Sequence, residues 1–261
     1  MKSFLTSLKI FSIITFSMMI SSVAANSFMT SPPKLSFKFN RGIVRTIYII
    51  NKDSKTLRMQ ISKVYYAPGA KTGPYKNDSI LSKKAYDFDL TPYMRLSTKK
   101  IIVPVGKSRA IKLLISKPKH KLKPGTYKAF IYFKTIPTKV RVSKKKLKGV
   151  GVAVNLIFNQ NSSVTGAVGK GYPFAATYKC IRHDGHVKLD ITNPTSWQVN
   201  FKTNILNKSG KMLKESVQYK PVLPYTKGTR ELNLKGIDVS DVAKLTWMMN
   251  KKPYSVMCHS S

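Results

Sequence analysis

The chain has 261 residues, with 47 lysines and arginines against 10 aspartates and glutamates, for a formal net charge of +37. At 42% hydrophobic residues it is too apolar for a disordered basic tail, and its length allows one large domain or two of about 100–130 residues. So few acids argue against a paired-carboxylate hydrolase or an acidic calcium site. The charge instead predicts an anionic partner: nucleic acid, a lipid surface or an acidic protein.

Residues 1–24 have the layout of a secretory signal peptide. The basic residues Lys2 and Lys9 precede an apolar run from Ile10 to Ile20, and small residues follow up to Ala25. The run is shorter than the ~20 residues that a membrane-spanning helix needs, although an uncleaved membrane anchor is the alternative. We therefore expect an exported protein, which argues against cytoplasmic nucleic acid as the main partner.

The rest of the chain predicts an all-β fold. Short runs of alternating apolar and β-branched residues are separated by turn-forming residues, as at Pro104-Val105-Gly106 and Pro124-Gly125. Such runs are typical of β-sandwich domains. The expected strands of the first domain are Lys34–Phe39, Val44–Ile50, Arg58–Tyr66, Asp87–Leu90, Lys99–Val103, Ser108–Ile115, Gly125–Thr135 and Val150–Phe158.

A second series of short strands lies beyond a stretch rich in Ser, Asn and Gly. That stretch, 161–171, predicts a linker. The strands expected after it are Phe174–Cys180, His186–Thr192, Gln198–Leu206, Arg230–Leu234 and Lys244–Met249. The resulting division is a signal peptide at 1–24, a first domain at 25–160, the linker at 161–171 and a second domain at 172–261.

One predicted strand has an unusual face. Because strand side chains alternate between faces, one side of it is continuously apolar and the other is mostly small. The apolar row consists of Val150, Val152, Val154, Leu156 and Phe158. The pattern fits either an ordinary core strand or a strand whose side chains are offered to another protein. Its place before the predicted linker and after the basic loop Lys139–Lys148 favours the second interpretation.

The two cysteines, Cys180 and Cys258, both lie in the second domain. In an oxidising compartment an even pair usually forms one disulfide, and two free thiols are the alternative. His183-Asp184-Gly185-His186 is more typical of a hairpin turn than of a metal site, which is the alternative. The sequence has no catalytic triad pattern, phosphate-binding glycine loop or zinc pattern, so we expect no enzymatic activity, no metal and no other cofactor.

Four features of the sequence resemble the periplasmic pilus-assembly chaperones of the chaperone–usher pathway. Residues 28–37, FMTSPPKLSF, are similar to the N-terminal edge strand of that family. Residues 88–96, FDLTPYMRL, with 102–113, IVPVGKSRAIKL, resemble its mid-domain signature "TP…(L/P)xG…R(I/L)". Residues 125–137, GTYKAFIYFKTIP, resemble its "Y-x-V-x-x-I-P" strand, and the apolar row lies where its donor strand lies. The likeness covers most of residues 28–160 and is closest to the branch that serves class 5, colonisation-factor-type fimbriae.

The resemblance implies two immunoglobulin-like domains around a cleft, and a periplasmic protein that caps fimbrial subunits by donor-strand complementation. An outer-membrane usher would then receive each subunit, and neither nucleic acid nor a small-molecule substrate is expected as a partner. The family anchors the carboxyl terminus of the subunit with an Arg on the first strand and a Lys on the donor strand. By motif position these correspond here to Lys34, with Lys38 as a rival, and to Asn155, which offers only a neutral hydrogen bond.

An exported basic adhesin, or a binding module for acidic glycans or anionic lipid, is the alternative function. It would bind through lysine patches, and its binding would weaken steeply with salt.

Overall fold

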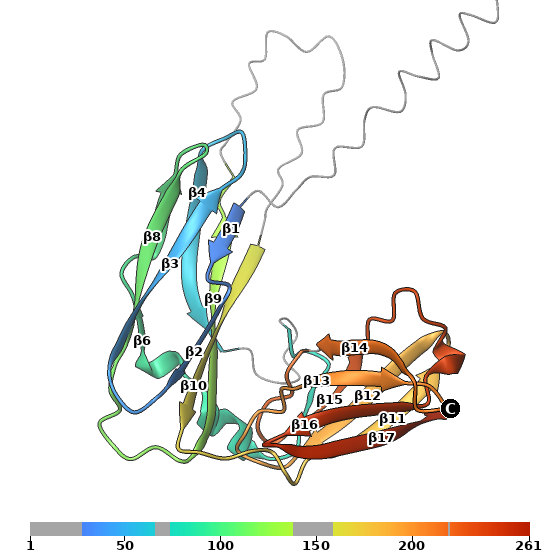
Figure 1. The fold of residues 1–261 in the computed structure, drawn as a ribbon. Helices are drawn as coiled ribbons and strands as arrows, with labels where there is room; N and C mark the ends of the chain where they lie inside the picture. The colour runs from blue at the N-terminus through green and yellow to red at the C-terminus, as the bar shows by residue number, and fades with distance from the viewer. Residues whose placement is uncertain (1–27, 66–73, 138–158, 219) are drawn as a thin grey trace, which may run out of the picture.

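The computed structural model describes residues 28–65, 74–137 and 159–261, apart from residue 219. The predicted signal peptide, the apolar row Val150–Phe158 and Asn155 therefore lie outside the described residues. Two bodies make up the described chain, each built of strands around its own core (Figure 1). The expectation of an all-β protein with two immunoglobulin-like domains is confirmed.

The N-terminal domain is a sandwich of two sheets. One sheet has the order β1 (Phe28–Ser31), β3 (Ile43–Asn51), β8 (Ser108–Ile115), β6 (Met94–Leu96). The other has the order β2 (Lys34–Lys38), β10 (Asn159–Val168), β9 (Gly125–Thr135), β4 (Leu57–Val64), β7 (Lys100–Val103). Alternate residues of both sheets, such as Ile47, Ile111, Met59 and Phe133, are fully buried between them.

The chain changes sheets near its start. Strand β1 pairs with β3, whereas β2 pairs in parallel with β10, and Pro32-Pro33 separates the two strands. The prolines lack the N–H that would continue a ladder, so they end β1 and allow the switch. The Ser31–Pro32 peptide bond is cis. This switch places β2 at the edge of the second sheet, next to β10.

The C-terminal domain is one eight-stranded sheet whose two halves enclose a core. Its order is β14 (Met212–Gln218), β13 (Lys202–Leu206), β16 (Lys244–Met249), β17 (Lys252–Ser260), β11 (Thr177–His183), β12 (His186–Asn193), β15 (Thr226–Glu231), β5 (Ser79–Ile80). Leu189 of one half and Leu245 of the other are fully buried in the same cluster. Cys180 and Cys258, paired directly across β11 and β17, form the predicted disulfide.

The predicted linker at 161–171 is wrong. Residues 159–168 form β10, which pairs with β9 along ten residues and with β2 on its other side. The small and polar residues that resemble a linker are required by packing: a Cβ on Gly166 would lie 3.0 Å from the Phe37 ring. Ser162 is fully buried and its hydroxyl bonds the hydroxyl of Thr30. The first domain thus extends to 168, and only residues 169–176 connect it to β11.

Four expected strands also differ from the structure. Phe174–Cys180 is shifted to β11, and Gln198–Leu206 is shortened to β13. Residues Lys83–Phe88 form a 3-10 helix, η2, capped by Ser82, where a strand was expected at Asp87–Leu90. A second 3-10 helix, η3 (Thr91–Tyr93), follows, and η5 (Val239–Asp241) lies in the C-terminal domain. The strand expected at Arg230–Leu234 begins and ends earlier, as β15. No helix among the described residues is long and apolar enough to cross a membrane.

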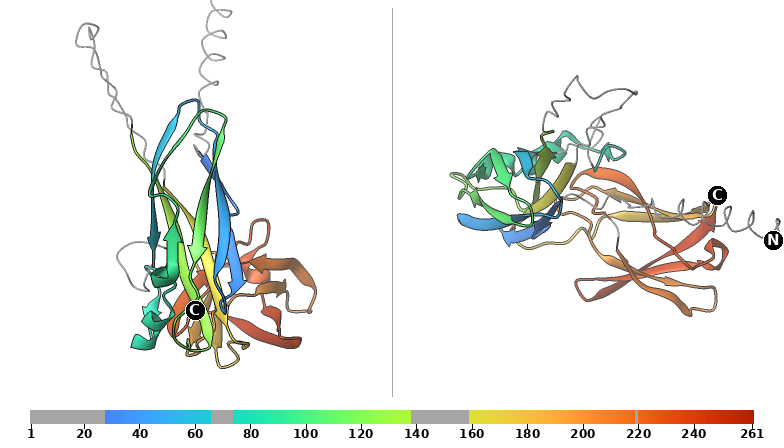
Figure 2. Two further views of the ribbon diagram at one scale, coloured as in Figure 1. Left: turned by 90° about the vertical axis from the view of Figure 1, so that its left-hand side faces the viewer. Right: turned by 90° about the horizontal axis from the view of Figure 1, so that it is seen from above.

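The two domains meet at one end and enclose an angle (Figures 1 and 2). A segment of the N-terminal half, residues 74–81, crosses to the other domain, where β5 pairs with β15. Tyr75 of this segment packs against Phe130 of β9 and Leu223 of the C-terminal domain in a small buried cluster. The joint is therefore both hydrogen-bonded and apolar.

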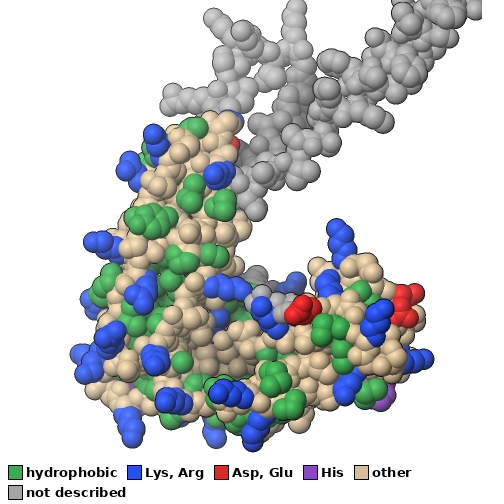
Figure 3. Space-filling model, in the orientation of Figure 1, with side chains coloured by type: hydrophobic (Ala, Val, Ile, Leu, Met, Phe, Trp, Pro, Cys, Tyr) green, Lys and Arg blue, Asp and Glu red, His purple; other side chains and the backbone are tan. Residues whose placement is uncertain are grey.

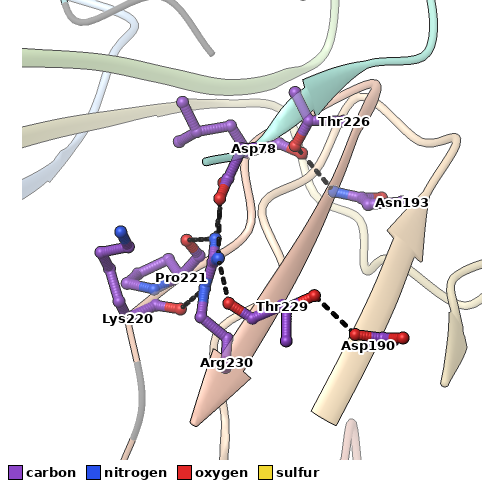
Figure 4. Close-up of polar contacts among 9 residues, drawn as sticks. Asp78, Asp190, Asn193, Lys220, Pro221, Thr226, Thr229 and Arg230 are labelled. Atoms are coloured by element: carbon purple, nitrogen blue, oxygen red, sulfur yellow. Dashed lines mark hydrogen bonds and ion pairs between the residues drawn. The ribbon is translucent and has the colours of Figure 1, made fainter. Parts of the chain in front are cut away.

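A buried ion pair lies within this joint (Figure 4). The guanidinium of Arg230 donates from Nη1 and Nη2 to the two carboxylate oxygens of Asp78, at 2.7 and 2.6 Å. It also donates to the carbonyls of Lys220, Pro221 and Thr229, so each of its nitrogens has a partner. Both side chains are at most 4% exposed. Because its donors and acceptors are satisfied, this pair tolerates burial.

The Asp78–Arg230 pair predicts that an Asp-to-Asn substitution lowers stability much more at Asp78 than at a surface aspartate. Asp78→Asn leaves Arg230 charged, buried and without its anion, so the free energy of unfolding should fall by about 3 kcal/mol. Asp87→Asn is the control, since Asp87 pairs with Lys123 on the surface and should change stability little. Urea unfolding of both variants measures this, and equal effects would contradict the account.

Candidate functional site in the interdomain cleft

The concave side of the joint is a cleft with walls from both domains. Its N-terminal wall is the outer face of β2, β10 and β9, where Ser36, Thr165 and Thr126 line a cavity together with residues of the second domain. Figure 3 shows Lys and Arg side chains over the visible face of both domains and few acidic ones. The cleft is therefore set in a broadly positive surface.

Strand register places a lysine in this wall. Lys128 of β9 lies opposite Thr165 of β10, and Thr165 lies opposite Ser36 of β2. Strand alternation then puts Lys128, Ser163 and Lys34 on the same face of the sheet. Lys128 is 5% exposed, whereas Lys34 at the start of β2 is exposed.

The ammonium of Lys128 is buried without an anion. Its Nζ donates to Ser163 Oγ and to Thr165 Oγ1, both at 2.7 Å, and lies 5.6 Å from the centre of the Phe130 ring. No carboxylate of the described residues forms an ion pair with it. Hydroxyls and a ring face solvate a cation only in part.

The electrostatic consequence is a lowered pKa. Burial, and then the positive charge of Lys34, lowers the pKa of Lys128 from 10.5 to about 8. Near neutral pH the amine is still mostly protonated, so the wall holds a charge that the fold does not neutralise. An anion that enters the cleft would relieve this cost, which makes the Lys34–Lys128 pair a candidate carboxylate-binding site.

Lys34 of this pair is the residue that motif position predicts as an anchor, and its role stays a prediction. Lys34 and its rival Lys38 both lie on β2, each two residues from the cavity-lining Ser36. Lys34 is the one whose charge lowers the pKa of Lys128. Lys128 was missed, although a lysine within the otherwise apolar run Tyr127–Phe133 was a visible signal. Asn155 and the apolar row lie outside the described residues, so their roles stay predictions.

The histidine motif forms a turn. Asp184 and Gly185 have positive φ angles of 47° and 71° and connect β11 to β12 as a hairpin. His183 pairs with Asp184, and His186 pairs with Glu231. Within the described ranges, no three His, Cys, Asp or Glu side chains are grouped as metal ligands would be.

Comparison with known proteins supports the fold. No protein-family model matches the sequence, and no curated protein matches it. The structure is similar to the SafB chaperone in its complex with the SafA pilin of Salmonella enterica. The TM-score is 0.51 and the identity 14%, over 90% of this chain and 98% of that chain.

Two further chaperones are similar over most of their length. They are DraB of E. coli, with a TM-score of 0.48, 14% identity and coverage of 90% and 97%, and YadV, with a TM-score of 0.48, 16% identity and coverage of 88% and 99%. The SafB comparison shows that this chain has the fold of a pilin chaperone, as the resemblance predicts. Assignment to the class 5 branch stays a prediction.

The lowered pKa of Lys128 predicts a pH-dependent stability. Between pH 8 and 10.5 the folded chain has lost the Lys128 proton while the unfolded chain still binds it, so stability rises with pH. The unfavourable contribution of the buried charge, on the order of 3 kcal/mol, is complete below pH 8 and vanishes above 10.5. Wild type should therefore gain stability relative to Lys128→Met across this interval.

Urea unfolding at several pH values measures the difference between the two proteins, which cancels the titration of the other lysines. Lys100→Met, at an exposed position on β7, is the matched control and should show no such trend. A pH-independent difference between wild type and Lys128→Met would contradict the burial of a charged amine.

Proposed function

We propose that this chain is a periplasmic chaperone that caps fimbrial subunits by donor-strand complementation and delivers them to an outer-membrane usher. The observation that carries the proposal is the buried, uncompensated ammonium of Lys128 in the cleft of a fold shared with SafB, whose complex contains a pilin. Such a group needs an anionic partner from outside the chain, and a terminal carboxylate in the cleft would be one.

The donor strand supplies the second part of the proposal. A pilus subunit that lacks its last strand exposes an apolar groove and unpaired edge amides. The apolar row Val150–Phe158 ends one residue before β10 begins at Asn159. Its five large side chains would fill the groove while backbone hydrogen bonds pair the strands and alternation sets the register. At about 1.5–3 kcal/mol for each buried side chain, this row can hold a subunit tightly.

The anchor is the third part. Lys34 and Lys128 would bind the carboxyl terminus of the subunit, and Asn155 would contribute at most a neutral hydrogen bond. The second positive charge then comes from β9 rather than from the donor strand. Ser163 and Thr165 of β10 accept hydrogen bonds from the Lys128 ammonium and so hold it over β10, the strand that continues the donor strand. This position supports Lys128 as the source of the second charge. Proton loss from Lys128 above pH 8 should weaken the anchor.

The surface charge fits the same proposal. With 47 basic residues against 10 acidic ones, copies of the chain repel each other. Repulsion would keep a protein that offers an apolar strand from associating with itself. An acidic subunit, in contrast, would be attracted.

Co-expression with a fimbrial subunit from the same organism tests the proposed function. The subunit should be soluble and co-purify with wild type, and Leu156→Asp should abolish co-purification because it places a charge in the apolar groove. Val105→Asp, at an exposed apolar position in a loop, is the control for an added charge and should still bind.

The circular dichroism of free Leu156→Asp distinguishes the two interpretations of the apolar row. A folded variant that fails to bind supports a donor strand, whereas loss of folding indicates an ordinary core strand. A subunit that is equally soluble without this protein would overturn the proposal. Vesicle or glycan binding that weakens steeply with salt and is unchanged in Leu156→Asp would favour the basic binding module instead.

A further inference from the structure

A cavity of about 350 Å³ lies in the cleft between the two domains. On the N-terminal side it is lined by residues of β2, β9 and β10, among them Phe37, Thr126 and Thr165. On the C-terminal side it is lined by Trp197 and Phe201, by Met248 and Met249 of β16, and by the connector that follows β10. Its volume is at the lower end of the ~300–1,000 Å³ of ligand sites, so it suits one or two side chains.

The cavity adjoins the cationic pair. Thr126 and Lys128 are alternate residues on one face of β9, which separates them by roughly 7 Å along the strand. Thr165 lines the cavity and accepts a hydrogen bond from Lys128 Nζ. Ser36 of the lining is likewise two residues from Lys34 on β2. A group bound to the two lysines therefore lies next to the cavity.

The lining is uncharged and more apolar than polar. None of the cavity-lining residues is acidic or basic, and on the C-terminal side the methionines and aromatic rings lie beside the amides of Gln198, Asn200 and Asn250. Phe201 stacks on Trp247 with ring centres 4.6 Å apart, and Met248 is 60% exposed. Methionine side chains adapt to the shape of an apolar ligand, so the surface favours an aromatic or large aliphatic group over a charged one.

The position of Trp197 depends on a close approach of the backbone. A Cβ on Gly171 would lie 2.2 Å from Trp197 Nε1, so only glycine allows the connector to pass over this ring. Thr126 and the 196–198 segment are also joined, since Thr126 Oγ1 accepts from the N–H of Gln198 and the N–H of Thr126 donates to the Ser196 carbonyl. The two walls are thus held at a fixed separation.

We propose that this cavity receives the side chain of the last residue of the bound subunit while its carboxylate contacts Lys34 and Lys128. The inference rests on the proposed function and adds a specificity to it: the preferred subunits end in an aromatic or large aliphatic residue. The charged end and the apolar side chain of one residue match the cationic pair and the uncharged, mainly apolar cavity beside it. A basic last residue is disfavoured, because its charge would lie beside the two lysines in a lining that offers no anion.

Short peptides with a free carboxylate test the inference without the subunit. N-acetyl-Gly-Gly-Phe is compared with N-acetyl-triglycine and with the C-terminal amide of the Phe peptide, by titration of the amide chemical shifts of the exported full chain. The Phe peptide should bind in the millimolar range and at least about tenfold more tightly than triglycine. Its amide should lose most of this affinity, since the lysines then face no anion.

Two variants locate the site on the protein. Met248→Asp places a charge in the cavity and should remove the advantage of Phe over triglycine. Met257→Asp is the matched control, with the same substitution at a 52% exposed position of β17 outside the cavity lining, and should leave that advantage unchanged. Lys128→Met should weaken both carboxylate peptides.

The outcomes separate this inference from the proposed function. If both peptides bind alike and both need Lys128, the anchor stands and the cavity assignment is overturned. If the Phe peptide binds without regard to Lys128 or to its own carboxylate, the cavity is an independent apolar site, which also overturns the inference. Absence of saturable shifts up to about 10 mM peptide overturns the cavity inference as well. The chaperone function would still be tested separately, by co-purification of the subunit.

Discussion

The joint between the two domains depends on a charge pair that links positions 152 residues apart in the sequence, Asp78 and Arg230. Desolvation of two ions is costly, and it is tolerated here because every guanidinium nitrogen has an oxygen partner. The pair fixes segment 74–81 on the C-terminal domain, and Tyr75 of that segment contacts Phe130 of β9. The position of the second domain is thereby tied to the strand that carries Lys128.

Lys128 and Arg230 are both buried cations, but they differ in their partners. Both cations are almost fully buried, but only Arg230 has a carboxylate within the described structure. The fold keeps the uncompensated cation in position with two hydroxyls of β10 and a ring of β9. A buried charge of this kind lowers the stability of the free protein and raises the affinity for an anion from outside. In our proposal the subunit supplies that anion, so the Lys128 charge is uncompensated in the free protein and neutralised in the complex.

Much of the fold follows from local sequence patterns, because period-two alternation is a local property of strands. Val44–Ile50 and Ser108–Ile115 were predicted nearly to the residue, and the disulfide followed from the cysteine count and the expected compartment. The linker failed because composition does not reveal packing. Residues of β10 are small since Gly166 lies against Phe37, and they are polar since Ser163 and Thr165 bind Lys128.

The candidate site was less predictable, because it is made by strand order rather than by sequence neighbours. Lys34, Lys128 and Thr165 come together only when β10 inserts between β2 and β9, and this pairing cannot be read from any one segment. The ion pair of Asp78 with Arg230 has the same origin. Motif position made Lys34 a candidate through the resemblance, whereas Lys128 was missed because it lies on β9, which the resemblance does not assign to the anchor.

The central claim is that residues 150–158 become a strand of the bound subunit. Hydrogen–deuterium exchange of the purified chaperone–subunit complex, compared with the free chain, measures this directly. The account predicts strong new protection of the amides of 150–158 in the complex, with little change in the C-terminal core strands β11 and β12. A stable complex in which 150–158 exchange as they do in the free chain would contradict it.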